Sequence, residues 1–119
     1  RFMLTKESRA HDNFKHLLLD QSKNGTMLSM KKLMPVRLVM NEFYEKVKEL
    51  EDQGADPSEL EALLGHGRAM NGIHHGDLIE GELESGQICA AINDIPNVSE
   101  LVMRLKEEYD LALENLTKD

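Results

Sequence analysis

Apolar side chains recur every three or four residues in three stretches of this 119-residue chain, which are residues 6–20, 36–52 and 98–116. That spacing places them along one side of an α-helix, whereas a half-buried strand requires alternation at every second residue. The pattern therefore predicts a mostly α-helical fold. It is clearest in the last stretch, where the apolar positions are Val98, Leu101, Val102, Leu105, Tyr109, Ala112 and Leu116.

Local signals predict where two of the helices begin and end. Asp56 can cap a helix whose first residue is Pro57, and Glu59 stands three residues after the cap, as in a capping box. Gly65 is suited to end this short helix. Upstream of it, Pro35 is compatible with a first helical position, so we expect one amphipathic helix over residues 35–52.

The other segments carry weaker patterns. Residues 1–5 are typical of the end of a β-strand, and we expect no strand after them. Residues 26–34 are apolar without a clear period and are interpreted as a packed connector. Six of the eight glycines lie within residues 65–86, which favours short helical turns there, and residues 87–92 are expected to be helical or compactly coiled.

Charge and composition exclude several classes of partner. Lys and Arg number 14 against 22 Asp and Glu, so the formal net charge is −8. Nucleic-acid binding requires cations that replace condensed counterions, so we expect no nucleic-acid partner. No apolar run approaches the roughly 20 residues that span a bilayer, so no membrane association is expected. A single cysteine, Cys89, fits a reducing cytoplasm.

Three segments, in this order, carry a resemblance to one family. Residues 1–15 contain Arg-Phe, then Glu-Ser, Ala-His and Lys; residues 35–43 contain Arg37 and Asn41 before an aromatic residue; residues 76–87 contain Gly-Asp, Gly and Ser-Gly-Gln. Together they resemble the C-terminal part of nitronate monooxygenases, formerly called 2-nitropropane dioxygenases. The FMN-dependent enoyl-acyl-carrier-protein reductases share the pattern.

The resemblance implies a fold and a division of the chain. Members of this family have a TIM-type (β/α)8 barrel with a small helical domain. By that resemblance, residues 1–25 form the end of the last barrel strand and the helix after it. Residues 26–92 form the small, glycine-interrupted helical domain, and residues 93–119 form the C-terminal helix. The chain is accordingly interpreted as a fragment of a longer protein.

The resemblance also implies a function, that of an FMN-dependent oxidoreductase acting on a small molecule. It assigns Arg1 and Phe2 to the edge of the FMN phosphate site. It assigns Ser85, Gly86 and Gln87 to substrate binding. The family carries its catalytic histidine and its glycine-rich phosphate loops earlier in the sequence. We therefore assign no catalytic residue here, and expect the fragment to be inactive alone and to lack FMN.

The choice between a nitronate and an enoyl thioester as substrate stays open. Glu84 stands where an apolar residue or serine is common in the family, and an anionic side chain there would repel a nitronate. The residues that decide the substrate are expected upstream.

Three alternatives remain from the residues themselves. A stand-alone helical module that binds a partner helix would account for the amphipathic stretches. The Met and Leu residues of 27–40 favour self-association if no barrel covers them. His74 and His75, with Asp77 and Glu80, suggest a metal site, but adjacent histidines point to different sides, and we assign no metal ligand.

Overall fold

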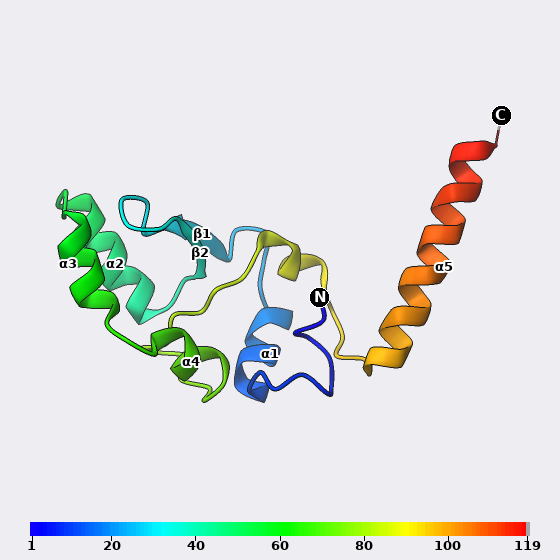
Figure 1. Cartoon of the computed structure of the whole chain (residues 1–119), viewed down its shortest axis with the longest axis horizontal. Helices are drawn as coiled ribbons and strands as arrows, with labels where there is room; N and C mark the ends of the chain where they lie inside the picture. Colours follow the sequence, from blue (N-terminus) through cyan, green and yellow to red (C-terminus); the bar gives the residue numbers. More distant parts are fainter. Residues whose placement is uncertain (119) are drawn as a thin grey trace.

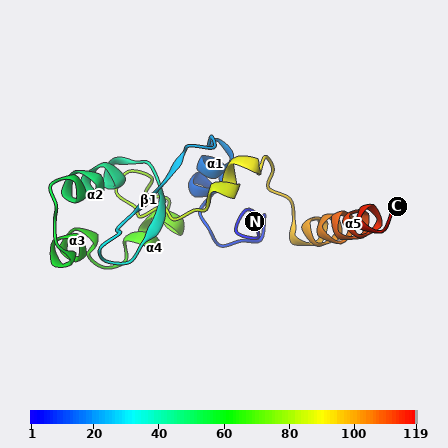
Figure 2. The same cartoon turned by 90° about the horizontal axis from the view of Figure 1, so that it is seen from above.

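The computed structural model describes residues 1–118 as an elongated molecule of 55 × 34 × 21 Å. Its radius of gyration is 17.4 Å, whereas a compact domain of this length has about 13–14 Å. Figure 1 shows the reason: a body holds the first four α-helices and a small sheet, and the last helix projects away from it. Figure 2 shows the same separation from above.

The fold is helix-rich, with a two-stranded antiparallel sheet inserted near its middle. Short helices surround that sheet, and one long helix ends the described chain. In chain order the elements are α1 (Asp12–Leu19), β1 (Thr26–Ser29), β2 (Val36–Val39), α2 (Glu42–Asp52), α3 (Pro57–Leu64), α4 (Arg68–Ile73), the 3-10 helix η1 (Gln87–Ala91) and α5 (Val98–Thr117).

The sheet corrects two expectations, that no strand follows residue 5 and that one helix spans residues 35–52. Strand β1 pairs with β2, with Thr26 opposite Val39 and Ser29 opposite Val36. The β-branched residues of β2 favour a strand once a partner satisfies their backbone groups. The helix then begins seven residues later than expected, because the Asn41 side chain caps it by accepting a hydrogen bond from the Tyr44 amide at 2.9 Å.

The N-terminal segment is also different from the expected strand end and helix. Residues 1–10 form turns, in which the Leu4 amide donates to the Arg1 carbonyl and the Ser8 amide donates to the Thr5 carbonyl. The buried Lys15 ammonium donates to the carbonyls of Thr5 and Ser8 at 2.8 and 2.9 Å. These bonds replace ladder partners, so helix α1 begins only at Asp12.

Strand β2 separates two hydrophobic cores. Successive side chains of a strand point to opposite faces, and so Leu38 and Val39 enter different clusters. Val39 packs in the core that contains Phe14 of α1 and Leu83. Leu38 packs in the core that contains Phe43 of α2. The strand therefore connects the N-terminal helix to the α2–α3 pair.

Helix α3 begins as the local signals predicted. The Asp56 side chain accepts hydrogen bonds from the amides of Ser58 and Glu59, and the Glu59 carboxylate accepts one from the Asp56 amide. Pro57 is the first helical residue, and Gly65 ends the helix with a φ of +62°. The predicted capping box is confirmed.

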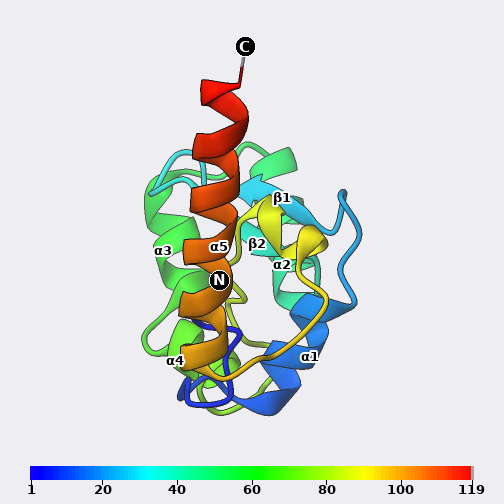
Figure 3. The same cartoon turned by 90° about the vertical axis from the view of Figure 1, so that its right-hand side faces the viewer.

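Helix α5 has the predicted extent but not the packing that its apolar stripe suggests. Leu101 is buried at its first turns, and residues 102–118 are all exposed. In the view of Figure 3, α5 stands in front of the body. The apolar side of this helix therefore faces solvent over most of its length.

Candidate functional site

The segment before η1 runs along strand β2 as a third, short extended stretch. The Val39 amide donates to the Leu83 carbonyl at 2.9 Å, and the Ser85 amide donates to the Arg37 carbonyl at 3.1 Å. Glu84 forms an isolated antiparallel bridge with Leu38. This pairing holds the three predicted substrate-binding residues at the edge of the body.

Side chains alternate along this extended stretch. Leu83 is fully buried in the core with Phe14, whereas Glu82 and Glu84 line a hollow beside α3. Ser85 follows Glu84 and is therefore directed to the opposite face. The carboxylate of Glu84 thus does not share a face with the Ser85 hydroxyl.

Ser85, Gly86 and Gln87 form an accessible turn into η1. Ser85 is half-buried, and Gly86 and Gln87 are exposed. Gly86 has extended backbone, and a Cβ atom at this position would meet no heavy atom within 4 Å. The turn offers a hydroxyl, an amide and an open backbone to a ligand, and its assignment to substrate stays a prediction.

Gly76, Asp77 and Gly81 have a packing role in this structure. Gly76 has a φ of +78°, and a Cβ atom there would lie 2.4 Å from the His11 ring. The Asp77 carboxylate accepts hydrogen bonds from the amides of Ile79 and Glu80. Gly81 lies against the backbone of helix α4. This part of the motif therefore builds the turn that delivers the chain to residues 82–87.

Arg1 is bound by Asp94, for which no role in the site was predicted. Its guanidinium donates to the carbonyls of Leu4 and Asp94, and to the Asp94 carboxylate at 2.6 Å. Arg104 of α5 donates to the same carboxylate at 2.6 Å. The hydrogen bond from Arg104, with the charge of Arg1, lowers the pKa of Asp94. Asp94 thus links the N-terminal turn to α5.

Arg1 and the start of η1 meet around one hollow of about 270 Å³. Its lining includes Arg1, Ile88, Asp94 and Leu105, although Ser85, Gly86 and Gln87 lie beside it and do not line it. Ile88 directly follows Gln87 and is 68% exposed. The two predicted groups of site residues are thus near one end of the body, although 83 positions or more separate them in the sequence.

The phosphate of FMN needs several hydrogen-bond donors that point to it. Arg1 and Phe2 do not supply such a set of donors. Most donors of the Arg1 guanidinium are engaged by Leu4 and Asp94. Phe2 is 52% exposed, and its backbone carbonyl accepts a hydrogen bond from the Thr5 hydroxyl. Arg1 and Phe2 can border a phosphate site whose remaining donors come from elsewhere, and this role stays a prediction.

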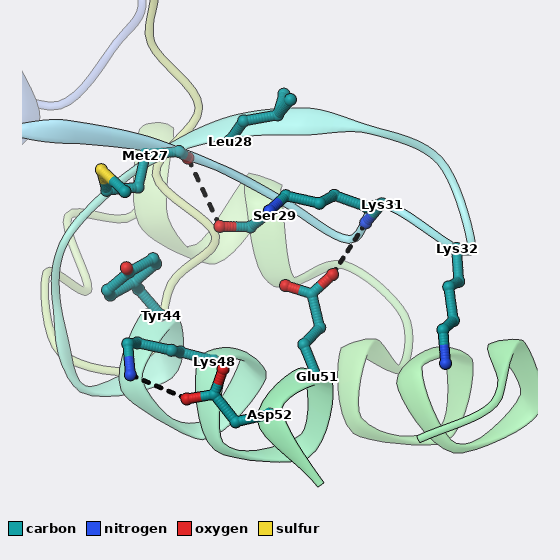
Figure 4. Close-up of a pocket in the computed structure, with 9 residues that line it drawn as sticks. All are labelled: Met27, Leu28, Ser29, Lys31, Lys32, Tyr44, Lys48, Glu51 and Asp52. Carbon is teal, nitrogen blue, oxygen red and sulfur yellow. Dashed lines mark hydrogen bonds and ion pairs between the residues drawn. The ribbon is translucent and has the colours of Figure 1, made fainter. Parts of the chain in front are cut away.

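A second hollow, between β1 and α2, is lined by three lysines and by the acidic residues Glu51 and Asp52. Figure 4 shows Lys48 turned to Asp52, and the Lys31 amide bonded to Glu51. These bonds are 2.8 and 2.9 Å long. Lys32 donates to two backbone carbonyls. The positive charge of this hollow is therefore largely balanced within the chain, and it is a weak candidate for an anion site.

The histidine pair has structural partners. His74 contacts the Arg9 carbonyl through Nδ1, and His75 contacts the Asn71 side chain through Nδ1. Residues 1–118 contain no group of three His, Cys, Asp or Glu side chains placed to hold a metal ion. His11 caps α1, since its Nδ1 accepts a hydrogen bond from the Asn13 amide at 3.1 Å.

Comparisons with known proteins bear on the family and the fold of this chain. A family model described as nitronate monooxygenase matches residues 1–108. FabK from Thermotoga maritima superposes on 98% of this chain with a TM-score of 0.86 and 27% identity, and a structure of a mutant of that protein gives a TM-score of 0.77 at 22% identity. The chain spans 37% and 34% of the length of these two structures. A comparison with curated protein sequences gave no match.

The fold is thus that of a helix-rich segment found in FabK and matched by the nitronate monooxygenase family model. The chain belongs to the nitronate monooxygenase family. The predicted family resemblance is confirmed. Among the helices described, none is both long enough and apolar enough to cross a membrane.

Proposed function

We propose that this chain is the part of an FMN-dependent oxidoreductase that forms one wall of the active site, and that it is not catalytic alone. The observation that supports the proposal best is the fold match, in which nearly the whole chain corresponds to about a third of FabK. The flavin-holding barrel then belongs to residues outside this chain. FMN, when bound, supplies the redox chemistry, and the protein positions the substrate.

In this proposal the exposed turn at residues 85–87 contacts the substrate. The Gln87 amide can donate hydrogen bonds to oxygen atoms, and Gly86 lets a ligand approach the backbone. The Ser85 hydroxyl donates to the Gly86 carbonyl at 3.3 Å and can turn from it to a ligand. Both a nitronate and an enoyl thioester carry such oxygens. Since Glu84 is directed to the opposite face from Ser85, its negative charge is not an argument against a nitronate.

The first experiment is a titration of the chain alone with FMN, followed by flavin fluorescence. We expect no saturable change up to about 100 µM FMN, because Arg1 and Phe2 do not supply a complete phosphate cradle. Stoichiometric quenching of the FMN fluorescence by this chain would show that it carries a complete cofactor site. That result would contradict the proposal that the flavin site lies outside this chain.

The substrate contact is tested where this segment is joined to its barrel. There, Gln87→Ala is expected to lower kcat/KM roughly tenfold through one lost hydrogen bond, with the bound flavin unchanged. The matched control is Gln53→Ala, an exposed glutamine at the end of α2. Equal effects of the two variants, or loss of flavin with Gln87→Ala, would contradict a substrate contact.

The second candidate function, a helical interaction module, is favoured by one observation, which is the exposed apolar side of α5. Leu105, Tyr109 and Leu116 are 43%, 66% and 85% exposed. Exposed apolar area of this kind is typical of a surface that becomes covered by protein. In the residues 27–40 that we expected to associate, Met30 and Leu38 are buried, so the larger exposed apolar surface lies on α5.

We expect a solution of this chain alone to self-associate through α5. The double substitution of Leu105 and Tyr109 by Glu is expected to weaken the association at least about tenfold, because each change places a charge in the apolar stripe. Light scattering after size-exclusion chromatography, over a range of protein concentrations, measures the effect.

The control for this prediction is Leu111→Glu, which changes an exposed leucine outside the stripe of α5. It is expected to leave the dissociation constant nearly unchanged. A chain that remains monomeric at all concentrations would contradict the association. If Leu111→Glu weakens the association as much as the double substitution does, the choice of helix face would be contradicted.

A further inference from the structure

A hollow of about 400 Å³ beside α3 is separate from the turn at residues 85–87. It lies between the β1–β2 connection, the end of α3 and the segment that contains Glu82 and Glu84. Its lining includes the apolar side chains of Met30, Leu33 and Leu64, the carboxylates of Glu61, Glu82 and Glu84, and the His66 ring.

Glu82 is the unusual residue of this hollow. The residue is only 8% exposed. Its backbone amide donates to the Arg68 carbonyl, but its carboxylate has no hydrogen-bond partner within residues 1–118. Within residues 1–118 no fully buried side-chain oxygen lacks a partner, so the Glu82 carboxylate opens on the hollow, where a cation would compensate its charge.

The nearest cationic group does not provide that compensation. The Arg68 guanidinium donates to the carbonyls of Leu63 and Leu64 and to Glu80, and it stacks on the Phe43 ring. Burial is the main cause that raises the pKa of Glu82, and the charge of Glu84 adds to it, while Arg68 opposes it only in part. No Lys or Arg side chain lines the hollow, and its one other titratable group besides the three glutamates is His66.

We propose that this hollow binds a primary alkylammonium ion, with the ammonium group against Glu82 and Glu84 and the hydrocarbon chain along Met30, Leu33 and Leu64. An ammonium group has three N–H donors, which two acidic side chains can accept. The lining of the hollow contains no Phe, Tyr or Trp side chain, and these are the aromatic faces that favour a quaternary ammonium ion. The proposal does not depend on the oxidoreductase function.

The test is a titration of the isotopically labelled chain with n-hexylammonium chloride, followed by NMR of the methyl groups of Met30, Leu33 and Leu64. We expect saturable shifts of these methyls with a dissociation constant in the millimolar range. The uncharged n-hexanol has the same hydrocarbon chain and is expected to bind at least roughly tenfold more weakly, since it lacks the charge-assisted bonds.

The variant Glu82→Gln keeps the size of the side chain and removes its charge. It is expected to remain folded and to bind n-hexylammonium roughly tenfold more weakly. The matched control is Glu107→Gln on the exposed side of α5, for which the affinity is expected to be unchanged. The proposal is overturned if n-hexanol binds as tightly as the amine, if Glu82→Gln leaves the affinity unchanged, or if no methyl shifts at about 20 mM amine.

Discussion

Replacement of Gly81 by alanine is expected to destabilise the fold by about 3 kcal/mol or more. A Cβ atom at this position would lie 2.3 Å from the Asp77 carbonyl oxygen and 2.3 Å from the Gly72 Cα atom. Both contacts are with backbone, which cannot rotate away as a side chain can. Helix α4 and the turn at residues 76–81 would have to separate. Urea unfolding followed by circular dichroism measures the loss.

Gly86→Ala is the matched control for this prediction. Gly86 has a φ of −75°, and a Cβ atom there would meet nothing within 4 Å. Its free energy of unfolding is expected to change by less than about 0.5 kcal/mol. Equal stability of the two variants would mean that α4 and the segment before η1 do not pack as closely as described.

Asn41→Ala is expected to cost about 3 kcal/mol, because one side chain makes three hydrogen bonds. Its oxygen accepts from the Tyr44 amide and caps α2. Its Nδ2 donates to the carbonyls of Leu78 and Gly81 at 3.0 and 2.9 Å. Asn41 therefore connects the start of α2 to the turn before the candidate site. Chemical denaturation monitored by Tyr fluorescence or circular dichroism reports the change.

Two variants separate the contributions of Asn41. Asn41→Asp keeps the capping oxygen but replaces the donor to Leu78 and Gly81 by an acceptor, so it is expected to be no more stable than Asn41→Ala. Asn97→Ala removes the cap of α5, which packs on little of the body. It is expected to change the main unfolding transition by less than about 0.5 kcal/mol. A similar loss for Asn97→Ala and Asn41→Ala would show that capping alone explains the effect.

The features that were predicted correctly depend on neighbouring residues. The capping box of α3 involves Asp56, Ser58 and Glu59, and its geometry is decided within one helical turn. The extent of α5 follows from a cap at Asn97 and an unbroken helical period. Local patterns are sufficient here, because every hydrogen bond involved joins residues at most four positions apart.

The features that were missed depend on residues far apart in the sequence. The segment that became β2 has an apolar spacing that also fits a helix, and its pairing with β1 and with residues 83–85 decided the outcome. The turn at residues 1–10 is held by Lys15. No local pattern shows that a lysine will be buried against two carbonyls.

The site residues also differ in whether neighbouring or distant residues decide their position. The residues Ser85, Gly86 and Gln87 were chosen by resemblance, and their accessibility is visible only in the folded chain. The contribution of Asp94, which binds both Arg1 and Arg104, was not expected, because these partners lie 93 and 10 positions away from it in the sequence. Glu82 gave no signal in the sequence, because its burial depends on α3 and the β1–β2 connection.

The family, the helical character, the capped start of α3 and the apolar side of α5 follow from the order of residues, because motif order and helical period are properties of the chain. The division of two cores by β2, the bonds and contacts by which Gly81 and Asn41 join the site turn to the body, and the exposure of α5 within residues 1–118 appear only in the folded molecule. Burial and backbone pairing depend on which distant residues meet, and helical periodicity does not specify those partners.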